Sequence, residues 1–383
     1  MNADLAKRPI IDIDTHWTEP RDLWSKRAPA RLKDRVPKIA IGPGGNEHWF
    51  VEGDLALGAP GYSVIKRDGS KVRGTFSLPR FEDQHEAGYT AEARLKIMDA
   101  TGVYAEICYP NTLGFAGGGV MAVKDEELRN FCISAYNDGC GEVQEQGKGR
   151  LFPQAILPFW NLDATLKELK RCREELGLIG FTMTDSPQEW NLPPLQNPYW
   201  DPLWNMAQDY GMPINFHIGS GATGPLAWPE LEPGRMLAVS STCIFLNNIR
   251  TMVNLIFSGL LDRFPNLNFV SVESGLGWIP IVLESCNYQM RENMAKPMKL
   301  TPSEYFQRQI YSSYWFEKDD ICKSIHLIGE DHVMFETDFP HPTCIYPNVQ
   351  ETIEDSIGSM GESVQRKVLW ENASRVYGIP LPS

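Results

Sequence analysis

The sequence lacks the cysteine spacings, glycine motifs and long apolar runs that mark several large classes of protein. Its eight cysteines are scattered singly, with no CxxC pair, which excludes the usual zinc-finger and iron–sulfur spacings and suits reduced core thiols in a cytoplasmic protein. No GxGxxG motif follows a predicted strand and no phosphate-loop motif occurs, so nucleotide binding by those routes is not predicted. Because no apolar run approaches the roughly 20 residues of a membrane span, we expect neither a membrane anchor nor a signal peptide.

Positive charge is also in short supply. The 383 residues include 36 lysines and arginines against 49 aspartates and glutamates, a formal net charge of -13. This balance argues against nucleic acid and against an anionic membrane surface as partners. The apolar share of 42% and the charged share of 22% are ordinary for a soluble globular protein.

Short apolar runs alternate with helical patterns along most of the chain, which predicts a parallel sheet with crossover helices. About seven or eight such units predict a (β/α)8 TIM barrel, with residues 1–383 as a single metal-dependent domain. An open doubly wound sheet is the alternative. Turn signals divide residues 39–80 into short β-type runs, which predicts a small β-hairpin insertion near the N-terminus that covers one end of the barrel. The predicted strands are residues 10–20, 104–109, 151–157, 179–184, 213–218, 267–272 and 333–336.

The first predicted strand ends in a group of side chains that bind metals. Its sequence is I-I-D-I-D-T-H-W-T-E-P, in which Asp12, Asp14 and His16 alternate and so point to the same face. Glu19 follows where the strand must turn, because Pro20 cannot pair inside a sheet. Imidazole and carboxylate groups converging at a strand end are typical of a divalent-metal site. The alternative is a buried acid that caps a helix beside a surface histidine.

Later strands end in the same kinds of side chain. His217 closes P-I-N-F-H, Glu273 follows F-V-S-V, and Asp338 and His341 lie in T-D-F-P-H. In a barrel of this kind the C-terminal ends of the strands surround the active site, so we expect these side chains to meet there. A hydrogen-bonded core histidine at residue 217, or a helix cap at residue 338, is the alternative for each alone.

These segments resemble a known family. The first strand, M-D-A-T-G-V-Y at 98–104, D-R-F-P-N-L-N-F at 262–269, T-D-F-P-H at 337–341 and E-N-A-S-R-V-Y-G at 371–378 resemble the amidohydrolase superfamily, in the branch that includes aminocarboxymuconate-semialdehyde decarboxylase. The resemblance implies a metal-dependent TIM barrel. Two positions depart from the family pattern: Asp14 replaces the first histidine of His-x-His, and Glu273 stands where the decarboxylases have a catalytic histidine.

With those departures, the pattern is also similar to an oxygen-activating offshoot of the superfamily, the nonheme diiron monooxygenases of platensimycin and platencin (diterpenoid) biosynthesis. This resemblance implies two iron ions (Fe²⁺), dioxygen, an external electron donor and a bulky terpenoid-like substrate carried as a coenzyme A thioester. It assigns the metal to seven ligands: Asp14, His16, Glu19, His217, Glu273, Asp338 and His341. Three histidines and four carboxylates exceed what one tetrahedral zinc needs, which favours two octahedral ions. The resemblance further implies a homodimer.

Two other interpretations stay open. The first is a mononuclear Zn²⁺- or Mn²⁺-dependent hydrolase or decarboxylase that keeps the ordinary chemistry of the superfamily. The second is a catalytically silent barrel that serves as a binding protein. The candidates for an apolar substrate tunnel are Trp17, Trp160, Trp228, Phe115 and the glycines at 117–119. For most of the eleven tryptophans, however, we expect that they pack helices onto the barrel.

Overall fold

The computed structural model describes residues 7–221, 226–296 and 298–382. Its main sheet has nine parallel strands in the order β6-β5-β1-β12-β11-β10-β9-β8-β7. Gln154 alone separates β6 from β7, so these are the halves of one interrupted strand. One half pairs with β5 and the other with β8, which closes the sheet into an eight-stranded barrel. The strands are β1 (Ile10–His16), β5 (Val103–Tyr109), β6 (Leu151–Pro153), β7 (Ala155–Ile156), β8 (Phe181–Thr182), β9 (Ile214–His217), β10 (Phe269–Val272), β11 (Ile310–Tyr314) and β12 (Val333–Phe335).

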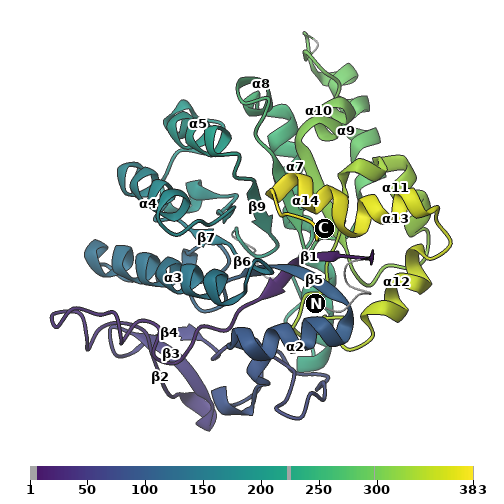
Figure 1. Cartoon of the computed structure of the whole chain (residues 1–383). Coiled ribbons are helices and arrows are strands. Elements are labelled where there is room, and N and C mark those ends of the chain that lie inside the picture. Colours follow the sequence, from purple (N-terminus) through teal and green to yellow (C-terminus); the bar gives the residue numbers. More distant parts are fainter. Residues whose placement is uncertain (1–6, 222–225, 297, 383) are drawn as a thin grey trace.

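The helices lie around the outside of this barrel, as Figure 1 shows. Helices α2 to α11 lie in the connections between successive strands of the barrel, and α12 to α14 follow the last strand. This is the (β/α)8 TIM barrel that the alternating pattern predicts. The helices are α2 (Ala91–Thr101), α3 (Glu126–Gln146), α4 (Leu162–Glu174), α5 (Asp201–Tyr210), α6 (Pro233–Cys243), α7 (Leu246–Phe257), α8 (Leu260–Arg263), α9 (Ile279–Asn293), α10 (Pro302–Gln309), α11 (Ile321–Ile328), α12 (Val349–Ile357), α13 (Glu362–Arg366), a π-helical turn (Lys367–Glu371) and α14 (Asn372–Tyr377).

The pattern analysis missed one strand, β11. Its sequence is I-Y-S-S-Y, and two adjacent serines in the middle break the apolar run that identifies the other strands. Both serines are fully buried, and the Ser313 hydroxyl donates to the carboxylate of Glu336. The Ser313 hydroxyl is therefore satisfied inside the barrel, which a hydrophobicity pattern does not reveal, whereas Ser312 Oγ has no hydrogen-bond partner among the described residues.

A second, three-stranded antiparallel sheet lies at the edge of the molecule (Figure 1), within the segment predicted as an insertion. It consists of β2 (Lys38–Ile41), β3 (Glu47–Val51) and β4 (Leu55–Gly58). The chain then returns to the barrel, where the Val64 amide donates to the Pro340 carbonyl at 3.1 Å. The division into one domain with an insertion at 39–80 stays a prediction.

A polar network fills the barrel where the third strand is interrupted. The Asn215 side chain donates to Gln154 Oε1 at 2.8 Å and accepts from the Tyr377 hydroxyl at 2.6 Å. All three residues are buried. The C-terminal helix α14 thus helps to hold the point at which the barrel closes.

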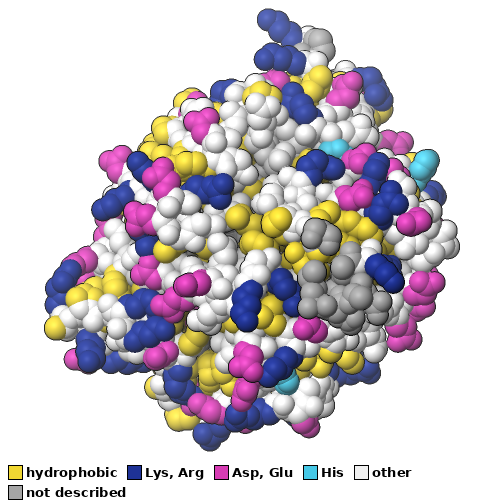
Figure 2. Space-filling view, viewed as in Figure 1, with side chains coloured by type: hydrophobic (Ala, Val, Ile, Leu, Met, Phe, Trp, Pro, Cys, Tyr) yellow, Lys and Arg dark blue, Asp and Glu magenta, His cyan; other side chains and the backbone are white. Residues whose placement is uncertain are grey.

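The surface mixes both signs of charge. On the face drawn in Figure 2, basic and acidic side chains alternate and apolar ones are scattered between them. Within the part of the chain that the structure describes, the helices are all too short or too polar to cross a membrane.

Candidate metal centre

Six of the seven predicted ligands meet at the C-terminal ends of the barrel strands. Their donor atoms form two overlapping groups in which all atoms lie within 4.8 Å of one another. The register explains part of this, because His217 at the end of β9 pairs with Val272, the residue before Glu273. The first group is Asp14, His16, His217 and Glu273, and the second is His16, Glu273, Asp338 and His341.

We call these six residues the metal cluster, and Asp14 and Asp338 lie at its centre. Asp14 Oδ1 lies 3.3 Å from His217 Nε2 and 3.6 Å from His16 Nε2. Asp338 Oδ1 lies 3.4 Å from His16 Nε2 and 3.3 Å from His341 Nδ1. Glu273 completes the cluster at 3.3 Å from His217 Nε2. Donor atoms from four strands thus face one small volume.

Two of the carboxylates leave their strands in an unusual backbone conformation. Glu273 has φ 54° and Asp338 has φ 60°, both in the left-handed region that L-residues with a Cβ rarely adopt. Such backbone strain concentrates at functional sites, where the surrounding structure holds it in place. Here it turns both side chains from the ends of β10 and β12 into the barrel mouth.

Neighbouring carbonyl groups set the orientation of two imidazoles. His217 Nδ1 lies 2.8 Å from the Ile218 carbonyl, and His341 Nε2 lies 2.8 Å from Asn111 Oδ1. An oxygen of this kind only accepts, so each of these ring nitrogens carries the hydrogen. In the neutral imidazole the other nitrogen then has a free lone pair, and in both residues it faces the carboxylates. This is the arrangement that a metal-binding histidine needs.

The cluster contains buried polar atoms that have no hydrogen-bond partner among the described residues. Asp14 and Asp338 have no exposed surface, yet both Asp14 oxygens and Asp338 Oδ1 are unsatisfied. The same holds for both nitrogens of His16 and for His217 Nε2. Leaving so many buried donor and acceptor atoms unpaired is costly unless a cation joins them. The donor set therefore fits one or more divalent metal ions.

Burial and mutual contact also shift the pKa values of the cluster residues. For His217 and Asp338 the shift favours metal binding, whereas for Asp14 it favours the protonated acid. Burial lowers the pKa of His217 to about 4, so its imidazole is neutral at ordinary pH. Burial alone would raise the pKa of Asp338, but His341 and His16 beside it hold that pKa below its usual value. Burial, and then the charge of Asp338, raise the pKa of Asp14.

Glu19 is the predicted ligand that the structure places outside both groups. Its carboxylate accepts from the backbone amides of Asn111 and Thr112 at 2.9 and 3.0 Å and from the Thr112 hydroxyl at 2.6 Å. These bonds fix the loop that follows β5. Since Asn111 also accepts a hydrogen bond from His341, Glu19 stabilises the metal cluster indirectly, through Asn111.

Asp12 likewise lies outside the groups, although the alternation in β1 placed it on the same face as Asp14. Its carboxylate accepts from the Thr337 amide at 3.0 Å and from the Asp14 amide at 3.1 Å. The register of β1 against β5 shifts between Asp12 and Thr15, so strict alternation does not hold there.

Glu336 is a buried acid beside the cluster that sequence reasoning overlooked. It has no exposed surface, and its carboxylate accepts from the Glu273 amide at 3.2 Å. Burial, and then the charge of Asp14, raise its pKa well above the usual value. Its place directly after β12 is the same signal that identified Glu273 after β10.

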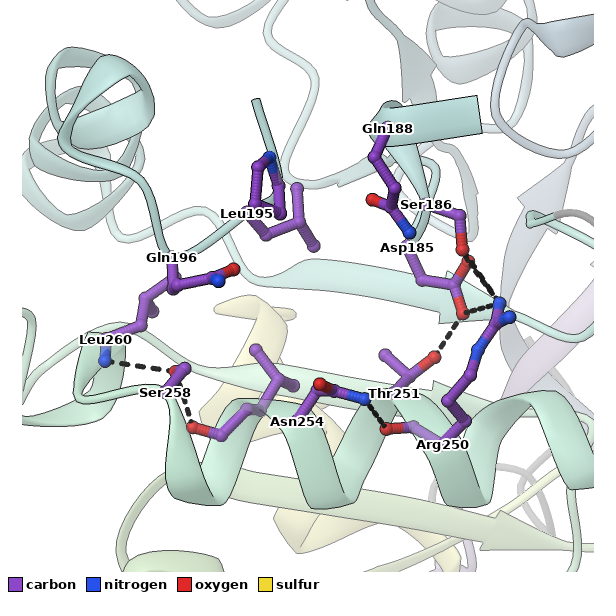
Figure 3. Close-up of a pocket in the computed structure, with 12 residues that line it drawn as sticks. Asp185, Ser186, Gln188, Leu195, Gln196, Arg250, Thr251, Asn254, Ser258 and Leu260 are labelled. Carbon is purple, nitrogen blue, oxygen red and sulfur yellow. Dashed lines mark hydrogen bonds and ion pairs between the residues drawn. The ribbon is translucent and has the colours of Figure 1, made fainter. Parts of the chain in front are cut away.

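Asp185, another acid just beyond a predicted strand, belongs to a different part of the mouth. It lines a hollow of about 570 Å³ between residues 185–196 and α7, which Figure 3 shows. Arg250 Nη2 lies 3.4 Å from the Asp185 carboxylate and donates to Ser186 Oγ at 2.7 Å. The Thr251 hydroxyl donates to the same carboxylate. Asp185 is thus neutralised by protein partners and takes no part in the metal cluster.

The structure does not confirm that the four expected aromatic side chains form one apolar pocket or tunnel. Phe115 lies against the cluster histidines, whereas Trp160 packs beneath Arg129 and donates to Asn130. Trp228 is 81% exposed and Trp17 lies beside the buried Arg94.

Several relatives with named activities are decarboxylases. The gamma-resorcylate decarboxylase of Rhizobium sp. (strain MTP-10005) is 25% identical over 306 residues, which cover 77% of this chain and 89% of that protein. Among solved structures, an amidohydrolase of Mycobacterium avium subsp. paratuberculosis K-10 has a TM-score of 0.73 at 20% identity, covering 97% of this chain and 99% of that one. A dihydroxybenzoic acid decarboxylase of Polaromonas sp. JS666, with bound manganese and the inhibitor 2-nitroresorcinol, has a TM-score of 0.64 at 17% identity, covering 97% of both chains.

These relatives contradict the diiron monooxygenase prediction. They are metal-dependent decarboxylases and not oxygenases, so an oxidoreductase acting on a terpenoid thioester has no support. The iron pair, dioxygen, the electron donor and the acyl-thioester substrate that this prediction carried lose their support with it. The error has a physical cause: carboxylates and imidazoles bind many divalent cations, so a ligand set alone does not identify the reaction.

One family accounts for nearly the whole chain. Residues 11–379 match the Amidohydrolase family, a range that runs from β1 past the end of α14 and includes every member of the metal cluster. The superfamily resemblance and the TIM barrel are therefore confirmed. The chain belongs to the amidohydrolase family.

Proposed function

We propose that this protein is a metal-dependent decarboxylase of a small aromatic carboxylic acid. The observation that carries the proposal is the buried cluster of unsatisfied carboxylate and imidazole donors at the barrel mouth. The decarboxylases among its relatives support the reaction class, and the manganese in one solved relative supports the choice of metal. Zn²⁺ is the alternative cation for the same ligands.

Asp14, His16, His217, Asp338 and His341 would hold the metal, with Glu273 on the open side of the cluster. The bound cation would supply positive charge that attracts and orients an anionic substrate. The two ligand groups share His16 and Glu273, so the cluster has donors for one or for two ions. Mixed carboxylate and imidazole ligands suit Mn²⁺.

The protein's own part in the reaction is to bind the acid, exclude water and deliver one proton. Decarboxylation breaks the bond between the ring carbon and the carboxylate, releases carbon dioxide and leaves an electron pair on the carbon, which a proton then takes. Glu273 is 9% exposed, against no exposure for Asp14 and Asp338, so it is the cluster carboxylate that substrate meets first. We assign the proton delivery to Glu273.

The test is decarboxylation without dioxygen. Protein stripped of metal and reloaded with MnCl₂ is given a panel of hydroxylated benzoic acids in an anaerobic cell, and carbon dioxide release is measured. We expect turnover that depends on Mn²⁺ and not on dioxygen. No release from any member of the panel by fully metal-loaded protein would overturn the proposal.

Two variants separate metal binding from proton delivery. His217→Ala should lose both bound Mn²⁺ and activity, because it removes a donor from the centre of the cluster. Glu273→Gln should keep most of the bound Mn²⁺ but lose about 10²- to 10⁴-fold in turnover, the usual size of a general-acid contribution. His326→Ala, at an exposed histidine of α11, is the matched control and should behave as the parent.

A further inference from the structure

The metal cluster is almost wholly buried, so a substrate that binds the metal has to move a side chain that lies against it. Asp14, His16 and Asp338 have no exposed surface and His217 has 1%. His341 and Glu273, at 6% and 9%, are the most exposed members. Any acid that binds the metal must therefore displace whatever covers the imidazoles.

The covering side chain is Phe115. Its ring centroid lies 4.0 Å from that of His217 and 5.2 Å from that of His16. It also lies 6.0 Å from the ring of His341. One half-buried phenylalanine thus borders all three histidines of the cluster, and it is not itself a ligand.

The segment that carries Phe115 has a fixed base and a glycine-rich tip. At the base, the Glu19 carboxylate holds the amides of Asn111 and Thr112. At the tip, Gly114 and Gly117 both have φ 76°, a conformation that glycine adopts at no steric cost. The opposite wall is also glycine, since a Cβ at Gly219 would lie 3.6 Å from the Phe115 ring. The ring therefore lies between the histidines and a wall that has no side chain at Gly219, on a segment flanked by glycines.

We propose that Phe115 is the substrate-positioning residue of this site, and that its ring packs against the face of a planar aromatic acid bound at the metal. The inference rests on the proposed function for the identity of the substrate. Its chemistry follows from the contact that is already present: a flat ring that packs on imidazoles also packs on a flat ligand bound beside them. The ring swings on its glycine tip from the histidines to the ligand, while the base and His341 stay in position.

The first experiment tests whether Phe115 covers the metal cluster, and it does not depend on turnover. Mn²⁺-loaded protein is mixed with excess EDTA, and the rate of Mn²⁺ loss is followed for the parent, Phe115→Ala and Phe115→Tyr. Phe115→Ala should lose Mn²⁺ at least tenfold faster, and Phe115→Tyr at the parental rate, because a ring still covers the histidines. Phe50→Ala, at a half-buried phenylalanine of β3, is the matched control and should match the parent. Equal rates in Phe115→Ala and the parent would overturn the proposal.

The second experiment tests the contact with a planar ligand. Binding of 2-nitroresorcinol to the Mn²⁺-loaded protein is measured by calorimetry for the parent and for Phe115→Leu, which keeps apolar volume but has no flat face. We expect Kd to rise roughly three- to tenfold, the size of one aromatic pair, with unchanged Mn²⁺ content. For any benzoic acid that is turned over, KM should rise by a similar factor while kcat changes less than twofold.

The outcomes distinguish this proposal from the proposed function. Weaker 2-nitroresorcinol binding in Phe115→Leu with no carbon dioxide release from any acid would leave Phe115 as a ligand contact and overturn only the decarboxylase. Normal turnover with unchanged Kd and KM in Phe115→Leu would overturn only the role of Phe115.

Discussion

At the scale of single residues, the ligand imidazoles owe their orientation to side chains that bind no metal. Asn111 is the clearest case, because its Oδ1 fixes the tautomer of His341 from a distance of 2.8 Å. Asn111→Leu removes that acceptor, and Mn²⁺ affinity should fall about 10- to 100-fold, as is usual for partners of metal-binding histidines. Titration calorimetry with MnCl₂ measures the change. Asn111→Asp keeps an acceptor at the same place and should lose much less; equal losses in both variants would count against the orientation argument.

A second residue-scale prediction concerns His332, which precedes β12 and so lies at the opposite end of the barrel from the metal cluster. Burial lowers its pKa, and Arg375 adds to this, while the Ile310 carbonyl and Asp331 oppose it. A histidine whose pKa is lowered by folding binds its proton more readily in the unfolded chain, so its stability contribution is lost as pH falls through the unfolded value of about 6.5. Urea unfolding at pH 7.5 and 5.5 should show a larger fall in unfolding free energy for the parent than for His332→Gln. An equal fall in the unfolding free energy of the parent and of His332→Gln would contradict this prediction.

At the scale of the elements, the weak point of the barrel is the interruption at Gln154. A Cβ at Gly180, the residue before β8, would lie 2.3 Å from Gln154 Oε1 and 3.4 Å from Asn215 Nδ2. Gly180→Ala should therefore displace the buried amide network and lower the free energy of unfolding by about 1–3 kcal/mol, the usual cost of overpacking. Thermal unfolding measures it. Gly361→Ala is the control. It should leave the melting temperature almost unchanged, because a Cβ added at Gly361 has no contact within 4 Å.

The elements also show what sequence patterns can and cannot predict. Apolar runs located β1, β5, β9, β10 and β12, because each of these strands is uniformly buried. The same reasoning found six members of the metal cluster, since parallel strands bring their ends together. It could not assign Glu19, whose partners are backbone amides of a loop, because the path of that loop is a tertiary property. It missed β11 for a related reason, since Ser313 meets its partner Glu336 only in the folded barrel.

At the scale of the whole molecule, the metal connects parts of the chain that are far apart in sequence. Ligands from β1, β9, β10 and the segment after β12 would share one ion, so binding should favour the folded state by mass action. At a free Mn²⁺ concentration of about 100 times Kd the gain is about 2.7 kcal/mol. Differential scanning calorimetry should show a lower melting temperature in EDTA that recovers with MnCl₂. His217→Ala should show no such recovery, and a metal effect of equal size in that variant would place the ion elsewhere.

Two further predictions at this scale, the homodimer and the cytoplasmic location, rest on the sequence alone. Analytical ultracentrifugation at several protein concentrations measures the first. A monomer at every concentration would contradict it.

The pairing of the first barrel strand with the last has a consequence for how the protein is made. β1 lies beside β12, with Asp12 opposite Phe335, and the Asp338 amide donates to the Asp14 carbonyl at 2.9 Å. During synthesis on the ribosome, Asp14 and His16 emerge more than 300 residues before Asp338 and His341. The nascent chain therefore cannot complete the cluster, or any ion site that needs Asp338 and His341, until translation of the barrel is nearly finished.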